Sequence, residues 1–514
     1  MKHFLFLIAI GFAVLTGGLT PPRSCAADFI TYSEHGAVGD GVTDDFEAII
    51  KAHTAANVAG LPVKAEAGKT YYIGNVNRTA PIQTDTDWTD AKFIIDDIEV
   101  EPRNSHVFHI SSKLPSVRIT TVTTLKKNQS KLDLSLPQDA LIDVTDNNIR
   151  RYIRFGPNQN EGSAQTDIFL VDKEGNVDQS TPIIWDFDTI TAITAYPIDT
   201  ETLTIKGGHF TTIANRSESR YSYYNRGISI TRSNVTVDGI YHAVTEGEDT
   251  GKPYSGFISI ARCTNVLVQN STFSGRKYYI TIGAAGTPVS MGTYDLNVNK
   301  ANNVTFKNCK QTNSIHDTRY WGIFGSNFSK NLTFDTVEFS RFDAHQGVTN
   351  ATIKNSVLGH QGINLIGQGI FLLENTKVTG GTLINLRSDY GSTFEGEIII
   401  RNCEFLPRNG VQSDAVLIGG NNSGQHDFGY TCYMPRKITI EGLTIDDTNH
   451  GSNYQGPKIF ANFNNAYRSE DYVQPFPYIL TEEVVIKDLT IKSGKPLIVS
   501  TNPFMFRNVK VTEE

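Results

Sequence analysis

Side chains able to do acid–base chemistry gather between residues 316 and 390 of this 514-residue sequence. We predict Asp343, Asp317 and His345 as catalytic residues. The predicted substrate-binding residues are His316, Arg319, Trp321, His360, Asn364, Asn385, Arg387, Asp389 and Tyr390. Two neighbouring carboxyl groups can cleave a glycosidic bond, because one protonates the leaving oxygen while the other activates water or attacks the anomeric carbon. One Asp would then be held protonated by its neighbour's charge. His345 or His360 would orient a carboxylate, the water or a substrate hydroxyl.

The same residues fit two other functions. A polysaccharide lyase needs a base that takes the C5 proton beside a uronate, and a cation that neutralises the uronate carboxylate. His345 or Tyr390 could be that base and Arg387 that cation. Ca²⁺ could replace the arginine, although the stretch is richer in His and Arg than in Asp ladders. A non-catalytic glycan-binding or adhesion protein is the third alternative. We rank the hydrolase first, acting on a complex polysaccharide that is acidic if the arginines bind it. Apart from this Ca²⁺, we expect no cofactor or metal.

These residues are far apart in the sequence, so the fold must bring them together. A short repeat of alternating apolar residues that ends in Asn and a small residue supplies the means. Its clearest copies are Asn265–Ser271, Asn303–Cys309, Asn350–Ser356, Ile370–Thr376 and Glu397–Cys403, with weaker copies that begin at Thr202, Asn234, Asn331, Lys437, Glu483 and Pro503. Each copy alternates with period two and is too short to bury its apolar face alone, so copies must stack on one another.

A second alternating segment accompanies most copies, as in residues 227–231, 257–261, 279–283, 362–366, 383–387, 414–418 and 496–500. The sequence therefore predicts an all-β fold, a right-handed parallel β-helix of about eleven coils. Equivalent side chains of successive coils would lie about 4.8 Å apart. Alternation places Asp343 and His345 on the outer face, and Asn385, Arg387 and Asp389 on one face of a nearby coil. The recurring Asn residues would form a structural ladder along the axis, because Asn tolerates tight turns.

The segment Ser33–His53 reads as a glycine-rich turn into an amphipathic helix, with Thr43 or Asp44 as the helix N-cap. This helix would cover the open end of the solenoid. The segment resembles the N-terminal signature of the pectate-lyase-like superfamily, which includes polygalacturonase-type glycoside hydrolases and phage tailspike depolymerases. The resemblance implies a β-helix in which Asp40, Asp44 and Asp45 belong to the scaffold and are not catalytic. Gly359–Gly362 is similar to the Gly-His-Gly element of polygalacturonases, but no adjacent Asp-Asp pair and no Arg-x-Lys accompany it.

Residues 116–200 interrupt the repeat with pieces typical of antiparallel strands, such as Leu132–Leu136 and Tyr152–Phe155. Asp167–Val177 carries a Glu-Gly turn between alternating apolar residues, which indicates a hairpin. We therefore divide the chain into a signal peptide (1–27), an N-terminal cap with the first coils (28–115), a small inserted β subdomain (116–200) and the β-helix with its groove (201–514).

The N-terminus predicts export. Lys2 precedes an apolar run, Phe4–Leu15, which is too short to span a bilayer, and small residues follow at Ser24–Ala27. We expect a secreted or periplasmic protein without a membrane span, and Pro21 and Pro22 disfavour a lipidated anchor at Cys25. The net charge of -8 without blocks of Lys or Arg argues against nucleic acid as a partner. The expected partner is a poly- or oligosaccharide.

Overall fold

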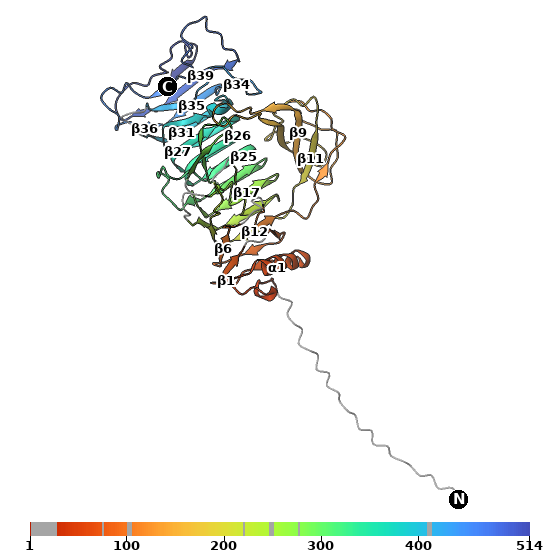
Figure 1. The fold of residues 1–514 in the computed structure, drawn as a ribbon. Helices are drawn as coiled ribbons and strands as arrows, with labels where there is room; N and C mark the ends of the chain where they lie inside the picture. Colours follow the sequence, from red (N-terminus) through yellow and green to blue (C-terminus); the bar gives the residue numbers. More distant parts are fainter. Residues whose placement is uncertain are drawn as a thin grey trace.

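A computed structural model describes Met1 and residues 28–74, 77–99, 105–218, 222–245, 251–275, 278–408 and 414–514, without the side chains of 278 and 279. The predicted signal peptide, with Cys25, lies outside the described residues. The described chain forms one elongated stack of parallel strands with a small antiparallel sheet beside it (Figure 1). Over the part of the chain that is described, no helix combines the length and apolarity needed to cross a membrane.

The predicted repeat forms the first row of strands in this stack. Its members pair in parallel, each with the next: β2 (Val63–Lys64), β5 (Thr86–Asp87), β12 (Leu203–Lys206), β15 (Val235–Asp238), β18 (Thr264–Gln269), β23 (Asn302–Lys307), β25 (Phe324–Asp335), β26 (Glu338–Lys354), β28 (Gly367–Glu374), β31 (Phe394–Arg401), β35 (Lys437–Glu441), β39 (Glu483–Lys487) and β41 (Lys510–Glu513). The stacked strands confirm the predicted parallel β-helix.

Two further rows complete the coils. One contains β1 (Asp40–Asp44), β3 (Thr70–Ile73), β6 (Lys92–Asp96), β13 (His209–Ile213), β16 (Tyr241–Val244), β19 (Thr272–Phe273), β24 (Lys310–Gln311), β26, β27 (Val357–Leu365), β29 (Lys377–Gly380), β32 (Glu404–Pro407), β36 (Thr444–Ile445) and β40 (Thr490–Ile491). The other contains β4 (Ala80–Ile82), β7 (Phe108–Ile110), β14 (Ile228–Ile230), β17 (Ile258–Ala261), β22 (Leu296–Asn299), β25, β26, β27, β30 (Thr382–Leu386), β33 (Val416–Gly419) and β37 (Lys458–Phe460). The long strands β25, β26 and β27 bend, so β25 and β27 each serve in two rows and β26 serves in all three.

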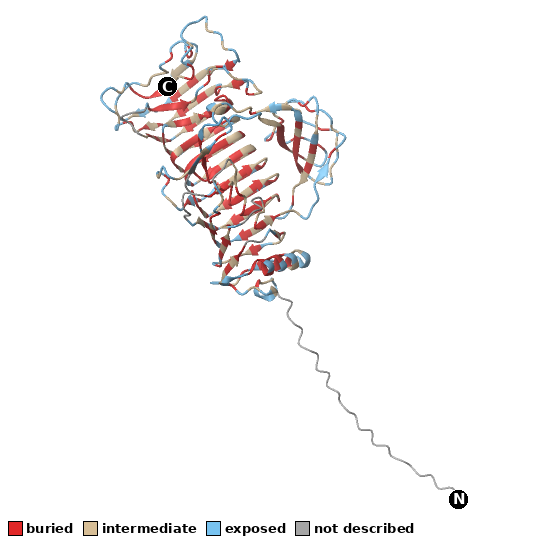
Figure 2. Ribbon diagram, in the orientation of Figure 1, coloured by how far each residue is buried: buried red, intermediate tan, exposed pale blue. Residues whose placement is uncertain are grey.

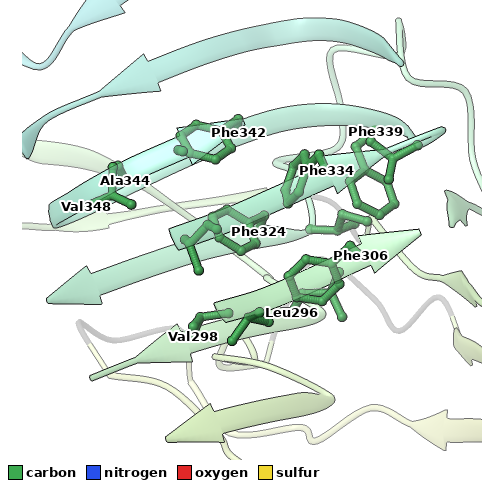
Figure 3. Packing of buried hydrophobic residues seen from close by; sticks show 14 of the residues in the cluster. Leu296, Val298, Phe306, Phe324, Phe334, Phe339, Phe342, Ala344 and Val348 are labelled. Carbon is green, nitrogen blue, oxygen red and sulfur yellow. The ribbon is translucent and has the colours of Figure 1, made fainter. Parts of the chain in front are cut away.

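Apolar side chains fill the inside of the coils. Buried and partly exposed residues alternate along the strands (Figure 2), as the period of two requires. In the middle of the stack, Phe306 of β23 packs with Phe324 and Phe334 of β25 (Figure 3), with ring centroids 4.9–5.7 Å apart. These fully buried rings hold the strands that carry the predicted site residues.

The Asn ladder is present at the turns. Asn308 and Asn270 both adopt the left-handed conformation, with φ of 50° and 51°. The Asn308 side chain donates to Asn270 at 2.7 Å, and Asn270 donates to Asp238 at 2.8 Å. Asn375 donates to Asn355 in the same way, at 3.2 Å. The turn residues therefore stabilise the stack through side chains as well as through the backbone.

Two predicted segments lie elsewhere. Residues 279–283 belong to an antiparallel hairpin formed by β20 (Tyr278–Ile282) and β21 (Pro288–Gly292), and β22 occupies the expected place in the row. The copy predicted at Pro503 is shifted, since residues 503–508 form turns and β41 carries the strand. In the first case alternation indicates a strand but not its partner, and in the second the residues that match the repeat form no strand.

The N-terminal helix α1 (Phe46–Ala59) closes the first coils, as expected (Figure 1). Its Phe46 and Ile49 side chains are fully buried in the main core. The N-cap is Asp45, one residue after Asp44 and two after Thr43. Its carboxylate instead accepts the Gly39 amide at 3.1 Å and thereby holds the glycine-rich turn.

The inserted subdomain is a four-stranded antiparallel sheet in the order β10-β9-β11-β8, built from β8 (Val117–Arg118), β9 (Ala140–Arg151), β10 (Ser163–Val171) and β11 (Ala192–Pro197). The predicted hairpin after β10 is present, with Gly175 at φ 83°. Neither Leu132–Leu136 nor Tyr152–Phe155 forms a strand. Residues 152–155 instead leave the sheet and contact the solenoid, where the Phe155 amide donates to the Asp389 carbonyl at 2.9 Å.

Candidate functional site

A cavity of about 270 Å³ lies against the middle coils, between the solenoid, the hairpin β20–β21 and the inserted segment. Its lining includes three arginines, one histidine, three aromatic rings and three asparagines: Arg154, Arg341, Arg387, His345, Tyr223, Tyr294, Trp321, Asn158, Asn297 and Asn327. No Asp or Glu of the described residues lines it. Of the predicted site residues, His345, Arg387 and Trp321 line this cavity.

Strand β26 supplies the middle of the site. Phe342 and Ala344 point into the core, so alternation turns Asp343 outward, as predicted, and Arg341 with it. Loops cover that outer face, and the two outward residues are 5% and 0% exposed. Asp343 therefore lies behind the cavity and is not among its lining residues.

The coils place distant residues side by side, as the repeat requires. Asp343 of β26 pairs with Asn364 of β27, which pairs with Asn385 of β30. The Asn385 side chain donates to Asn364 at 2.9 Å. The two asparagines thus continue an outer rung next to Asp343 and are not part of the cavity lining.

Two arginines and a tyrosine bind the Asp343 carboxylate. Arg341 lies 2.8 Å from Oδ2, and Arg387 donates to Oδ1 at 2.6 Å. The Tyr294 hydroxyl donates to Oδ2 at 2.9 Å. Burial alone would raise the pKa of Asp343, but the adjacent Arg341 and Arg387 charges hold this pKa well below its usual value. Asp343 is therefore an anion at neutral pH.

Asp389 bridges the solenoid and the inserted segment. Its carboxylate lies 2.8 Å from Arg387 and 2.7 Å from Arg154 of the segment after β9. Burial opposes the charged form, yet these two arginines lower the pKa of Asp389. The ring of Tyr390 lies beneath both guanidinium groups, 5.6 Å and 5.4 Å from their carbons. These contacts hold two cations of the cavity in place.

His345 occupies the junction of these groups. Its Nδ1 lies 3.2 Å from the Asn327 side-chain oxygen, and its ring packs edge-on against Tyr390 with centroids 5.5 Å apart. Burial and the nearby Arg387 charge lower the pKa of His345 to about 3. The imidazole is thus neutral at pH 7. Tyr390 itself is 1% exposed and does not line the cavity.

Arg341 is the cation with the most unused hydrogen-bonding capacity. Its guanidinium lies over the Trp321 ring at 4.6 Å and over the Tyr294 ring at 5.8 Å. Besides the Nη2 contact with Asp343, its buried Nε and Nη1 have no hydrogen-bond partner among the described residues. Because an unpaired buried donor is costly, these nitrogens indicate a place for an acceptor.

Asp317 lies away from this cavity. Its carboxylate binds its own neighbour Arg319, with contacts of 2.6–3.1 Å. The Arg319 hydrogen bonds lower the pKa of Asp317 to about 2. The expected pKa split, with one Asp held protonated, is therefore wrong: an arginine sits beside each carboxylate, so both pKa values fall.

His316 lies in the loop that carries Asp317, and His360 of β27 contacts this loop. His316 is exposed, and His360 is 4% exposed with Nδ1 3.1 Å from the Ile315 carbonyl. Neither residue lines the cavity. His360 packs the loop that carries Asp317 onto β27, so the structure gives it a contact with this loop and not with the arginine cluster.

Sequence reasoning missed Arg341, Arg154 and Tyr294. Arg341 had a readable signal, since it precedes Asp343 by two positions and must share its face. No sequence signal points to Arg154, because it reaches Asp389 only when the inserted segment docks on the solenoid. Tyr294 follows the hairpin β20–β21, which was assigned to the solenoid. Summing the cluster, three arginines and two carboxylates give 3 - 2 = +1. The cavity is thus suited to an anion.

Comparison with known proteins defines the fold further. No protein-family model and no curated protein matches the sequence. The tailspike gp61 of Pseudomonas phage phi297 is similar in structure, with a TM-score of 0.54, 14% identity, and coverage of 91% of this chain and 84% of that chain. The Gp54 tailspike of Acinetobacter baumannii bacteriophage AP22, solved with A. baumannii capsular saccharide, has a TM-score of 0.53 and 11% identity. That match covers 94% of this chain and 79% of that chain. The chain is therefore a right-handed parallel β-helix, akin in fold to these phage tailspikes.

Proposed function

We propose that this chain binds an acidic polysaccharide in the arginine-lined cavity and cleaves it by β-elimination beside a uronate. One observation carries the proposal: Arg341 lines a cavity that no described carboxylate lines, and two of its buried nitrogens have no hydrogen-bond partner among the described residues. A uronate carboxylate would supply the missing acceptors. The aromatic rings of Trp321 and Tyr294 would contact the faces of the sugar.

The cavity supplies the groups that β-elimination needs. Arg341 would neutralise the uronate carboxylate and so acidify the C5–H bond. The neutral imidazole of His345 would take the C5 proton, the C5–H electrons would form the C4=C5 bond, and the C4–O bond would break. The imidazolium would then return the proton to the departing oxygen. His345 is favoured over Tyr390 as the base because Tyr390 is buried outside the lining.

A carboxylate-based hydrolase, ranked first from the sequence, is less compatible with this geometry. It requires two carboxyl groups that face the scissile bond, one of them protonated. Asp343 and Asp317 both have lowered pKa values, and neither lines the cavity. Their catalytic roles stay predictions, as does the export that would bring the chain to an extracellular glycan.

Product analysis tests the proposed reaction. The protein is incubated with polygalacturonate, alginate, hyaluronan and chondroitin sulfate, and both ultraviolet absorbance and reducing ends are followed. β-Elimination gives an absorbing unsaturated uronate together with new reducing ends. Reducing ends without absorbance would establish the hydrolase instead, and binding without either product would establish the glycan-binding alternative.

An Arg341→Lys variant tests the cationic contact. Lysine keeps a positive charge beside Asp343 but cannot offer the same set of donors. Since a hydrogen bond to a charged group contributes roughly 1.5–3 kcal/mol, we expect the Kd for the acidic glycan to rise about 10- to 100-fold. Arg401→Lys is the matched control, because Arg401 binds Glu374 and Glu441 on the solenoid surface outside the cavity. Unchanged affinity in Arg341→Lys would contradict the proposal.

A further inference from the structure

A second cavity, of about 350 Å³, lies where the inserted subdomain meets the solenoid. Trp185 and Arg151 line it from the subdomain, Gly347–Thr349 from β26, and Tyr430 and Tyr433 from the loop before and within β34 (Cys432–Tyr433). It shares no lining residue with the arginine-lined cavity. The two cavities are nevertheless close to each other, because two residues of β26 line them: His345 lines the first cavity and Gly347 the second.

A wall of aromatic rings separates the two cavities. Tyr152 forms its centre and packs against Phe328, Tyr390 and Tyr430, with centroids 5.5, 6.1 and 5.2 Å away. Tyr152 adopts φ of 55°, a strained conformation for a bulky residue. Residues held in such conformations persist only where the surrounding packing fixes them, so the wall is a built feature of the interface.

Two of the three cations that line the second cavity pair with carboxylates. Lys330 lies 2.8 Å from Asp167, and both side chains are buried. Lys127 lies 3.2 Å from Glu395, and the Arg151 guanidinium binds Gln165 at 2.7 Å. Arg151 also lies over the Trp185 ring at 4.6 Å. None of these three cations has a buried nitrogen without a hydrogen-bond partner, as Arg341 has, so nothing in this lining calls for an anionic ligand.

The groups that face this cavity suit hydroxyl-rich, uncharged sugars. Trp185, Tyr430 and Tyr433 are partly exposed and offer apolar contact area. Asp186 is exposed, and Gln368 and Glu395 are partly exposed, so their oxygens can accept hydrogen bonds from sugar hydroxyls. We infer that this cavity is a second saccharide subsite that binds an uncharged pyranose unit.

This assignment rests on the proposed function only in taking a glycan as the ligand. His345 and Gly347 are two positions apart on β26, which corresponds to about 7 Å along a strand. An acidic unit and a nearby neutral unit of one heteropolysaccharide would thus occupy the two cavities together. The Tyr152 wall would keep the uncharged unit away from the arginines.

Tryptophan fluorescence separates the two cavities. The three tryptophans are Trp88 in the core, Trp185 in the second cavity and Trp321 in the first. A Trp321→Phe variant therefore reports on the second cavity, and Trp185→Phe on the first. The neutral probes are maltohexaose, cellohexaose, mannohexaose and xylohexaose, and the acidic probe is hexagalacturonate.

We expect a neutral hexasaccharide to change the emission of Trp321→Phe saturably and to leave that of Trp185→Phe unchanged. Adding Tyr433→Ala to Trp321→Phe should raise the Kd at least tenfold. Adding Tyr467→Ala should not, because Tyr467 packs on Tyr472 outside this cavity. Emission of Trp321→Phe that responds to none of the four neutral probes, or only to hexagalacturonate, overturns the second subsite.

The two proposals can fail independently. A neutral-probe response in Trp321→Phe without any unsaturated product would support the second subsite and remove the lyase. Unsaturated product and a hexagalacturonate response in Trp185→Phe, without any neutral-probe response in Trp321→Phe, would keep the lyase and remove the second subsite.

Discussion

Arg387 donates a hydrogen bond of 2.6 Å to Asp343, although 44 positions separate the two residues in the sequence. Asp343 lies on β26 and Arg387 directly follows β30, and β27 pairs with both strands. Arg341 binds the other oxygen of the same carboxylate. Asp343 thereby holds two cations at the edge of the cavity, and we propose that it positions the arginines.

Replacing Asp343 should therefore weaken the fold. In Asp343→Asn the two buried arginines lose their counter-charge, and breaking a buried ion pair typically costs about 3–5 kcal/mol. Urea unfolding should show a loss of this size. The control is Asp317→Asn, for which we expect less than about 1 kcal/mol because this carboxylate binds only an exposed arginine. An inactive Asp343→Asn with unchanged stability would instead support a catalytic carboxylate.

Acid should remove the stability that Asp343 contributes. Its pKa in the folded chain is lowered from the ordinary value of 3.8. The contribution is therefore complete above that ordinary value and is lost as the pH falls towards the folded-state pKa. Unfolding free energies measured between pH 5 and pH 2 should fall less steeply in Asp343→Asn than in the wild type. Equal slopes would show that the carboxylate is not the stabilised anion described above.

The pH dependence of turnover should reflect the lowered pKa of His345. Burial and Arg387 lower this pKa from 6.5 to about 3, so the free imidazole loses its proton far below neutrality. We expect kcat/KM to stay level between pH 5 and 7, since its acid limb follows the free enzyme. An acid limb centred near 6.5 would contradict His345 as the base in this environment.

A His345→Gln variant separates catalysis from binding. Loss of a general base typically costs about 10²–10⁴-fold in rate, so kcat should fall by that factor. The Kd for the acidic glycan should change little, because Arg341 and Arg387 remain in the cavity. Stopped assays for kcat and equilibrium titration for Kd give the two values. Full turnover in His345→Gln would assign the proton transfer to another group.

The sequence was sufficient for the solenoid because each coil repeats the same local physics. Alternating apolar residues with Asn at the turns specify a stacked strand wherever they occur. Asp343, Asn364 and Asn385 fall on one rung for this reason. The hairpin at Tyr278–Gly292 shows the limit, since its strands alternate equally well but pair with each other.

The site was only partly predictable because its environment is tertiary. Alternation placed Asp343 outward but gave no sign of the loops that bury it or of the arginines that fix its charge. The sequence groups Asp317 with Asp343 because the two residues fall on adjacent predicted coils. Loop direction is not encoded in strand period, and the loop turns this carboxylate towards Arg319.

Substitutions at Asn308 should separate the backbone and side-chain parts of the ladder. Asn308→Gly loses the bond to Asn270 but adopts φ of 50° readily. Asn308→Ala loses the bond and also pays about 1–2 kcal/mol for the left-handed conformation. We therefore expect Ala to destabilise the chain by about 1 kcal/mol more than Gly in thermal unfolding. Equal losses would show that the side-chain bond alone matters at this turn.

The wall between the two cavities depends on the absence of a side chain at Gly347. This glycine has φ of 85°, and an added Cβ would overlap the Tyr152 hydroxyl. Gly347→Ala should displace Tyr152, reduce stability by about 1–3 kcal/mol and alter Trp185 and Trp321 emission together. The control is Gly381→Ala, where a Cβ meets nothing within 4 Å. A Gly347→Ala variant with wild-type stability and emission would show that Tyr152 is not fixed against β26, and the two cavities would then merge into one groove.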